Sequence, residues 1–131
     1  MPREKSSTLT DLQLAVMDVL WDRGSATVRE VHGAVRYERE LAYTTVSTVL
    51  TRLKADKMVT AKPGVKPTRF SAAGTREEAT ERSVDKVVDD WFGGSRTSLV
   101  AYMAQADGRS VSDLREARDL LEEAIRKADE G

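Results

Sequence analysis

The chain has 131 residues, a formal net charge of −1 and 40% hydrophobic residues, which suits one folded domain or a domain with an oligomerising extension. It has no cysteine, so disulfides and thiolate metal sites are excluded and a reducing cytoplasm is the expected location. No apolar run approaches the length that crosses a bilayer, and no basic segment with an apolar core opens the chain, so we expect neither membrane insertion nor a secretory leader.

Two helices with N-terminal capping boxes are predicted at the start of the chain. Thr10 and Gln13 have the spacing of the first box, and an apolar stripe then runs to a break at Gly24. Thr27 and Glu30 have the spacing of the second box, which begins a shorter helix. The residues expected to face the core are Leu12, Ala15, Val16, Val19, Leu20, Val28, Val31 and Val35.

A third helix, predicted over about residues 43–56, has two unlike faces. An apolar stripe at helical spacing is formed by Val46, Val49, Leu50 and Leu53. The opposite side and its borders carry short hydroxyl side chains and one arginine: Thr44, Thr45, Ser47, Thr48, Thr51 and Arg52. Thr is a poorer helix former than the Glu, Lys or Gln usual on a solvated face. The pattern therefore favours a helix that lies against a polar surface, such as a DNA groove, over a solvated helix that happens to use Thr.

The distribution of charge also favours a polyanionic partner. Residues 1–75 contain 12 Lys or Arg against 8 Asp or Glu, whereas residues 76–131 contain 9 against 14. Within residues 42–71 there are 6 basic residues and only 1 acidic residue. A nucleic acid binds to such a basic region and repels an acidic one, so the second half of the chain is expected to face elsewhere.

A basic β-hairpin is predicted after the third helix, because residues 59–61 and 68–71 have strand character and a Pro/Gly turn joins them. Three helices and a basic hairpin make the winged helix-turn-helix arrangement, a mainly α fold. The candidates for groove contacts are then Thr44, Thr45, Ser47 and Thr48. The candidates for phosphate contacts are Arg52, Lys54, Lys66 and Arg69. Hairpin cations also guard a sheet edge against pairing, and both roles are compatible.

Residues 75–131 are predicted to form a separate helical domain after a DNA-binding domain of residues 1–74. Thr75 and Glu78 have capping-box spacing, Ser110 caps a last helix, and glycines at 93–94 and the Asp107–Gly108 pair separate three helices in all. Three helices of this size bury little alone, so we expect a homodimerisation domain. Its candidate contact residues are Val84, Val87, Val88, Trp91, Phe92, Leu99, Met103, Leu114 and Leu121.

No residue pattern indicates catalysis, a cofactor or a metal. His32 is the only histidine and is expected to be a packed or edge residue. Adjacent carboxylates such as Asp89 and Asp90 do not face one another on a helix. We therefore expect that the protein is not an enzyme.

The alternative function is an adaptor that binds protein through the third helix without sequence-specific DNA binding. That helix, however, offers a protein partner no outward apolar anchor larger than Ala55 and the Thr methyl groups.

Four segments together resemble the penicillinase-repressor family, also called BlaI/MecI/CopY. They are residues 12–21 (Leu-Gln-Leu-Ala-Val-Met-Asp-Val-Leu-Trp), residues 42–53 (Ala-Tyr-Thr-Thr-Val through Leu-Thr-Arg-Leu), residues 92–100 (beginning Phe-Gly-Gly-Ser) and residues 114–121. The resemblance covers roughly residues 8–128, and the Ala-Tyr-Thr-Thr-Val form is similar to the actinobacterial branch. It implies a homodimeric, nucleoid-associated winged-helix repressor that binds palindromic operators.

The resemblance also implies how repression is relieved. In the family, a membrane sensor metalloprotease that responds to β-lactam leads to cleavage inside the dimerisation domain. The family's Asn-Phe cleavage site aligns with Tyr102-Met103, where both residues differ. The copper-responsive branch has a C-terminal cysteine cluster, which this chain lacks. Staphylococcal members carry Lys and Arg at the positions of Thr44 and Ser47, so a different operator is expected.

Overall fold

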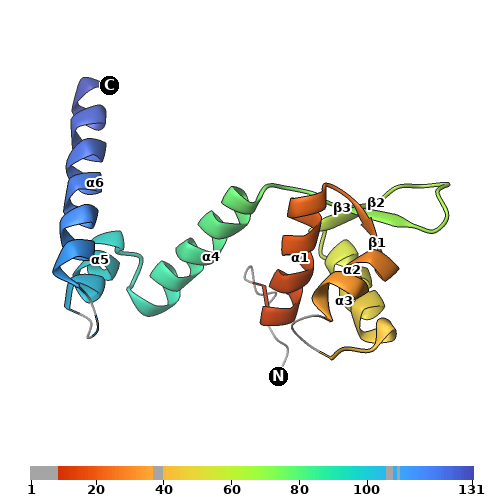
Figure 1. The fold of residues 1–131 in the computed structure, drawn as a ribbon. Helices are drawn as coiled ribbons and strands as arrows, with labels where there is room; N and C mark the ends of the chain where they lie inside the picture. The colour runs from red at the N-terminus through yellow and green to blue at the C-terminus, as the bar shows by residue number, and fades with distance from the viewer. Residues whose placement is uncertain (1–8, 37–39, 106–107, 109) are drawn as a thin grey trace. The chain divides into compact units, whose positions relative to one another are not determined.

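The computed structural model describes residues 9–36, 40–105, 108 and 110–131 (Figure 1). The described chain folds into two compact units that divide after residue 86, and each is considered by itself. The first unit contains α1 (Asp11–Arg23), β1 (Ala26–Thr27), α2 (Val28–Val35), α3 (Tyr43–Ala55), β2 (Val59–Ala61) and β3 (Arg69–Ala72). These elements form the winged-helix head predicted from the sequence, with the β2–β3 hairpin as its wing.

The sheet of the head has three antiparallel strands in the order β1-β3-β2. The predicted hairpin is confirmed, with Thr60 opposite Ser71 and Ala61 opposite Phe70. A third strand, which the sequence pattern did not predict, is present as well: β1 pairs on the other edge of β3, where Ala26 lies opposite Phe70. A strand of two residues has no periodicity to detect, and only its pairing partner, more than 40 residues later in the chain, makes it a strand.

One core joins the three helices to the sheet. Most of the apolar positions expected from the first three helices supply it, and Val16, Val31, Val46, Leu50 and Leu53 have exposed fractions of 0%. Val59 and Phe70 extend this core into the sheet. The stripe of α3 is therefore buried, which leaves its hydroxyl-bearing side toward the solvent.

The helix ends follow the predicted signals. In α1 the Thr10 hydroxyl accepts a hydrogen bond from the Gln13 amide at 3.2 Å, and the Gln13 side chain accepts one from the Thr10 amide at 3.0 Å. Thr27 and Glu30 make the same reciprocal pair at the start of α2. Gly24 ends α1 at φ 83°, a backbone conformation that glycine adopts without steric cost.

The helix α4 (Arg76–Trp91) begins in the first unit. The Trp21 indole donates a hydrogen bond to the Gly74 carbonyl at 3.0 Å just before the helix starts. Within the first turn of α4, the Arg76 guanidinium lies 5.3 Å from the centre of the Trp21 ring and pairs with Asp18 at 3.0 Å. Ala79 is buried. The early turns of α4 are therefore anchored on α1, beyond residue 74, where the sequence suggests a boundary.

The second unit contains the end of α4, α5 (Arg96–Gln105) and α6 (Val111–Glu130). The Gly94 amide donates to the Val88 carbonyl at 3.0 Å and ends α4 at the predicted glycine pair. Ser110 caps α6 as expected, through a 2.9 Å hydrogen bond from the Asp113 amide. Asp107 lies outside the described residues. None of the described helices is both long and apolar enough to span a membrane.

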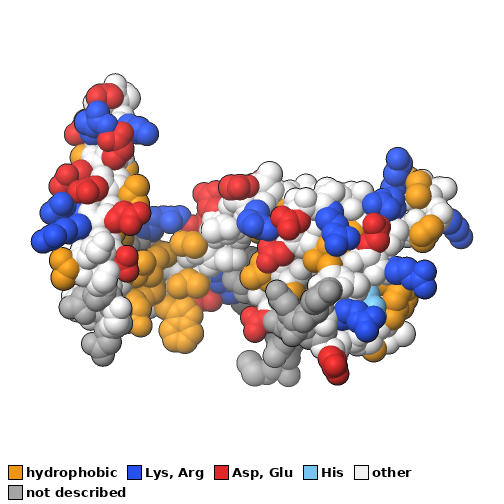
Figure 2. Space-filling view, in the orientation of Figure 1, with side chains coloured by type: hydrophobic (Ala, Val, Ile, Leu, Met, Phe, Trp, Pro, Cys, Tyr) orange, Lys and Arg blue, Asp and Glu red, His pale blue; other side chains and the backbone are white. Residues whose placement is uncertain are grey.

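Hardly any apolar side chain of α5 and α6 is covered in the single chain. Neither helix contains a buried residue, and Tyr102, Leu120 and Ile125 are at least 60% exposed. At the end of α4, Val88 is 3% exposed whereas Trp91 is 79% exposed. Hydrophobic side chains gather on the surface of α4 and α5 in Figure 2. Five of the predicted contact residues are therefore exposed in one chain, namely Val84, Val87, Trp91, Met103 and Leu121. Phe92, Leu99 and Leu114 are half-buried, and Val88 is already buried within the chain, so it is not available for a contact with a second copy.

Candidate nucleic-acid interface

The helix α3 presents a row of exposed hydroxyl groups. Val46, Leu50 and Leu53 are buried, so Thr44, Thr45 and Thr48 lie on the exposed side and Ser47 lies at its border. This is the orientation that the sequence predicts for these four groove-contact candidates. With no Glu or Lys on the first two turns, the outer surface of the helix is narrow and uncharged there. A surface of this kind can approach the floor of a major groove closely.

The hydroxyl groups of α3 are not equivalent. The Thr48 hydroxyl donates to the Thr44 carbonyl at 2.9 Å, and the Thr51 hydroxyl donates to the Ser47 carbonyl at 2.9 Å. Thr44 and Thr45 lie in the first turn, and the structure gives their hydroxyl groups no hydrogen-bond partner among the residues it describes. The first turn therefore has hydroxyl hydrogens to offer, whereas Thr48 and Thr51 use theirs within the helix.

His32 holds the entry to α3 in place. Its Nε2 lies 2.7 Å from the Leu41 carbonyl, which only accepts, so Nε2 is the donor. The His32 ring meets the Tyr43 ring edge-on, with centroids 5.9 Å apart. His32 is partly buried, in agreement with the expectation of a packed or edge residue. It fixes the backbone immediately before the exposed threonines.

Three of the four predicted phosphate-binding cations are exposed. Arg52 makes only a 3.6 Å ion pair with Asp56 and keeps 72% of its side chain exposed. Lys54 follows on the last turn of α3, and Lys66 lies in the wing loop. Figure 2 shows Lys and Arg side chains around the wing, at the right of the view.

Arg69 differs from these cations because it is tied into the head. Its guanidinium donates to the Ser25 hydroxyl at 3.2 Å, to the Ser25 carbonyl at 3.2 Å and to the Glu30 carboxylate at 3.0 Å. The hydrogen bond from the Thr27 amide, assisted by the Thr27 hydroxyl and Arg69, lowers the pKa of Glu30 below its usual value. Arg69 thus fastens the wing strand to the start of α2, and in the free protein its charge is already paired.

A cleft of about 550 Å³ separates α3 from the wing. It is lined by side chains from β1, α2, α3 and the wing: Thr27, Val28, Arg29, Tyr43, Ser47, Pro67, Thr68 and Phe70. Arg29, Tyr43 and Thr68 were not predicted from the sequence as site residues, because they meet only in the folded head. One sequence signal could have identified Arg29. It is a cation in the first turn of a helix, where the helix dipole is positive and unfavourable for it, and this suggests that an external anion binds there. The cleft offers one cation, several hydroxyl groups and apolar atoms, which suits a sugar-phosphate chain.

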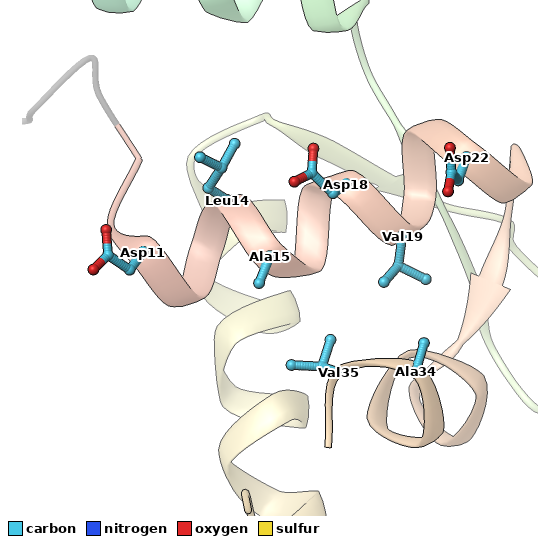
Figure 3. Close-up of a pocket in the computed structure, with 8 residues that line it drawn as sticks. All are labelled: Asp11, Leu14, Ala15, Asp18, Val19, Asp22, Ala34 and Val35. Atoms are coloured by element: carbon cyan, nitrogen blue, oxygen red, sulfur yellow. The ribbon is translucent and has the colours of Figure 1, made fainter. Parts of the chain in front are cut away.

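A second hollow, of about 340 Å³, lies between α1 and α2 and has the opposite charge (Figure 3). Ala15 and Val19 of α1 point toward Ala34 and Val35 of α2 in this view. Its remaining lining residues are Leu14 and the acids Asp11, Asp18 and Asp22. These acids make the hollow unsuitable for a polyanion, which leaves α3, the cleft and the wing as the candidate surface.

Comparison with known proteins identifies the family to which the chain belongs. The penicillinase repressor family matches residues 9–123. The chain is similar to the transcriptional regulator BlaI of Mycobacterium tuberculosis, with 37% identity over 121 residues, which is 90% of this chain and 88% of that protein. It is 20% identical to the penicillinase repressor of Staphylococcus aureus over 112 residues, 86% of this chain and 89% of that protein.

A solved structure supports the fold of the head. The solution structure of the DNA-binding domain of the repressor BlaI matches with a TM-score of 0.50 and 20% identity, over 58% of this chain and 93% of that domain. The family match, the similar proteins and the fold of the head lead to the same assignment. The chain belongs to the penicillinase-repressor family and is a transcriptional regulator with a winged-helix DNA-binding head.

Proposed function

We propose that this regulator is a homodimer that binds an inverted-repeat operator in double-stranded DNA and represses transcription in the cytoplasm, at the nucleoid. The observation that carries the proposal is the exposed hydroxyl face of α3, which is flanked by exposed cations and by the wing cleft. In helix-turn-helix proteins the second helix of the motif enters the major groove, and α3 has that position after α2.

The proposed contacts divide between bases and backbone. Thr44, Thr45, Ser47 and Thr48 enter the major groove, where hydroxyl and methyl groups reach base edges. Arg52, Lys54 and Lys66 bind phosphates on either side of it. The cleft between α3 and the wing holds the sugar-phosphate chain between these regions, with Arg29 and Tyr43 as added contacts. Arg69 is left out of this set because it is paired with Glu30.

The uncovered apolar face supports the dimer. Exposed residues of α4, α5 and α6 gain little by packing against one another in one chain, and a second copy would bury them. The predicted residues Val84, Val87, Trp91, Met103 and Leu121 are 37–79% exposed and available for this contact. Two linked heads bind an inverted repeat more tightly than separate heads, by about 10²-fold or more.

Relief of repression by a sensor-linked protease is the remaining part of the proposal. The aligned cleavage position, Tyr102-Met103, lies within α5, and both side chains are about 60% exposed. Proteases require an extended chain, so this helix must first open. A helix without buried residues opens at low cost, which makes α5 an accessible target once the dimer loosens.

The base-reading role is tested with the full chain carrying Ser47→Ala and Thr48→Ala. Duplexes selected by the wild-type protein from a randomised library are compared with a scrambled duplex in a fluorescence titration. We expect the double variant to lose about 10-fold or more in affinity for the selected duplex and under twofold for the scrambled one, because bases and not phosphates are affected. Equal losses on both duplexes would contradict the role of α3.

A further inference from the structure

We infer that α3 reads DNA with two chemically different sets of threonines: Thr44 and Thr45 donate hydrogen bonds to bases, whereas Thr48 and Thr51 pack their methyl groups on thymine methyl groups. This inference rests on the proposed operator binding and assigns a role to Thr51, which the sequence pattern did not place among the DNA contacts. The exposed face of α3 would then offer hydrogen-bond donors in its first turn and methyl groups in its later turns.

Thr48 and Thr51 use their hydroxyl hydrogens within the helix. A threonine hydroxyl carries one hydrogen and can donate one hydrogen bond. In Thr48 and Thr51 that hydrogen points to the carbonyl of the residue four positions earlier, at 2.9 Å in both cases. The hydroxyl oxygen is held against the helix backbone, so the methyl group is the part of each exposed side chain that is free to meet a partner.

The start of α3 lacks the carbonyl acceptors that its later turns provide. Residues 40 and 41, four positions before Thr44 and Thr45, precede α3, so no carbonyl of the helix itself is in place to accept. The Leu41 carbonyl, in addition, already meets His32 Nε2 at 2.7 Å. Among the described residues neither hydroxyl has an acceptor, so Thr44 and Thr45 keep their hydrogens for a partner such as a purine N7 or a thymine O4.

The methyl groups of Thr48 and Thr51 have a suitable partner in the major groove, the methyl group of thymine. The thymine 5-methyl group is the apolar feature that a base presents in the major groove, and side-chain methyl groups recognise it by contact. No cation lies between Thr48 and Thr51 in the sequence, and Arg52, which follows Thr51, is assigned to a phosphate and not to a base. The base pairs under the middle of α3 are thus expected to be T·A pairs with their methyl groups toward the helix.

The test replaces each thymine of the selected duplex in turn by deoxyuridine, which removes only the methyl group. At the thymines under α3 the wild-type protein should lose about fourfold in affinity for each half-site, as one buried methyl group predicts, and roughly 15-fold when both half-sites are changed. Thr48→Val keeps the methyl group and should bind within twofold of the wild type. Thr48→Ser removes the methyl group from both protomers, so it should lose roughly 15-fold, with no further loss on the duplex in which both half-sites carry deoxyuridine.

The matched control is Thr45→Val, the same substitution at a hydroxyl that is free in the protein. We expect it to lose about tenfold, because a hydrogen bond to a base is removed. Equal losses for Thr48→Val and Thr45→Val, or no effect of deoxyuridine at any position, would overturn the inference and leave operator binding intact. Failure of the wild-type chain to enrich any duplex would overturn the proposed function and this inference with it. Thermal unfolding of each variant confirms that the head is folded.

Discussion

The winged-helix head and the helices of residues 87–131 differ in what one chain can bury. The head encloses a core to which three helices and three strands contribute, and Leu50, Leu53 and Val16 are 0% exposed. The helices α5 and α6 enclose nothing, although they carry large apolar residues such as Leu121 and Ile125. The head has the interior of an independent domain, whereas the later helices resemble half of an interface.

This difference suggests that the two regions respond to separate perturbations. A defect inside the head lowers the free energy of unfolding of one chain, independent of concentration. A defect on the surface of α6 is expected to lower the affinity between the chains of the proposed dimer and to leave each head folded. The contacts of Trp21 and Arg76 at the start of α4 belong to the head and are expected to survive the second kind of defect.

The largest effect is expected in the core of the head. Leu50→Ala removes a fully buried side chain and should lower the free energy of unfolding by about 2–5 kcal/mol through lost burial and a residual cavity. The measurement is chemical denaturation followed by circular dichroism. Thr51→Ala, on the exposed side of the same helix, is the control and should change stability by under about 0.5 kcal/mol. Equal effects would mean that α3 does not pack as described.

The second effect is expected on α6. Leu121→Asp places a charge on the uncovered apolar face and should shift sedimentation from dimer to monomer. Operator affinity should fall by about 10²-fold because two independent heads replace a linked pair. Glu122→Asp, which keeps the charge of the neighbouring position, is the control. A dimer that persists in Leu121→Asp would place the interface elsewhere.

The smallest effect concerns acid stability. The Thr27 amide, with lesser help from Arg69, lowers the pKa of Glu30, and the Thr75 amide lowers that of Glu78. A lowered folded-state pKa stabilises the fold above the unfolded-state value near 4.5, and the gain is lost as the pH falls through the folded-state pKa. Glu30→Gln keeps the capping side chain without its charge, so stability should decline less between about pH 5 and pH 3. The Glu77→Gln control should retain the wild-type slope.

Local signals in the sequence predicted much of this fold. Capping pairs such as Thr27 with Glu30 are encoded three residues apart, and the burial of Val46 and Leu50 follows from their spacing. The strand β1, the Arg69 contact with Ser25 and the wing cleft depend on residues about 40 positions apart, which no local pattern contains. The hydroxyl partners of Thr48 and Thr51 depend on side-chain rotamers, so the sequence predicted a threonine face but not its division into two sets.

The most direct test of the account is the mass and affinity of the complex between the wild-type chain and its selected duplex. Native mass spectrometry should give two chains on a duplex with both half-sites, and affinity should fall by about 10²-fold when one half-site is scrambled. One chain on each duplex, with the same affinity for one or two half-sites, would contradict the claim that two self-sufficient heads act through a shared helical interface.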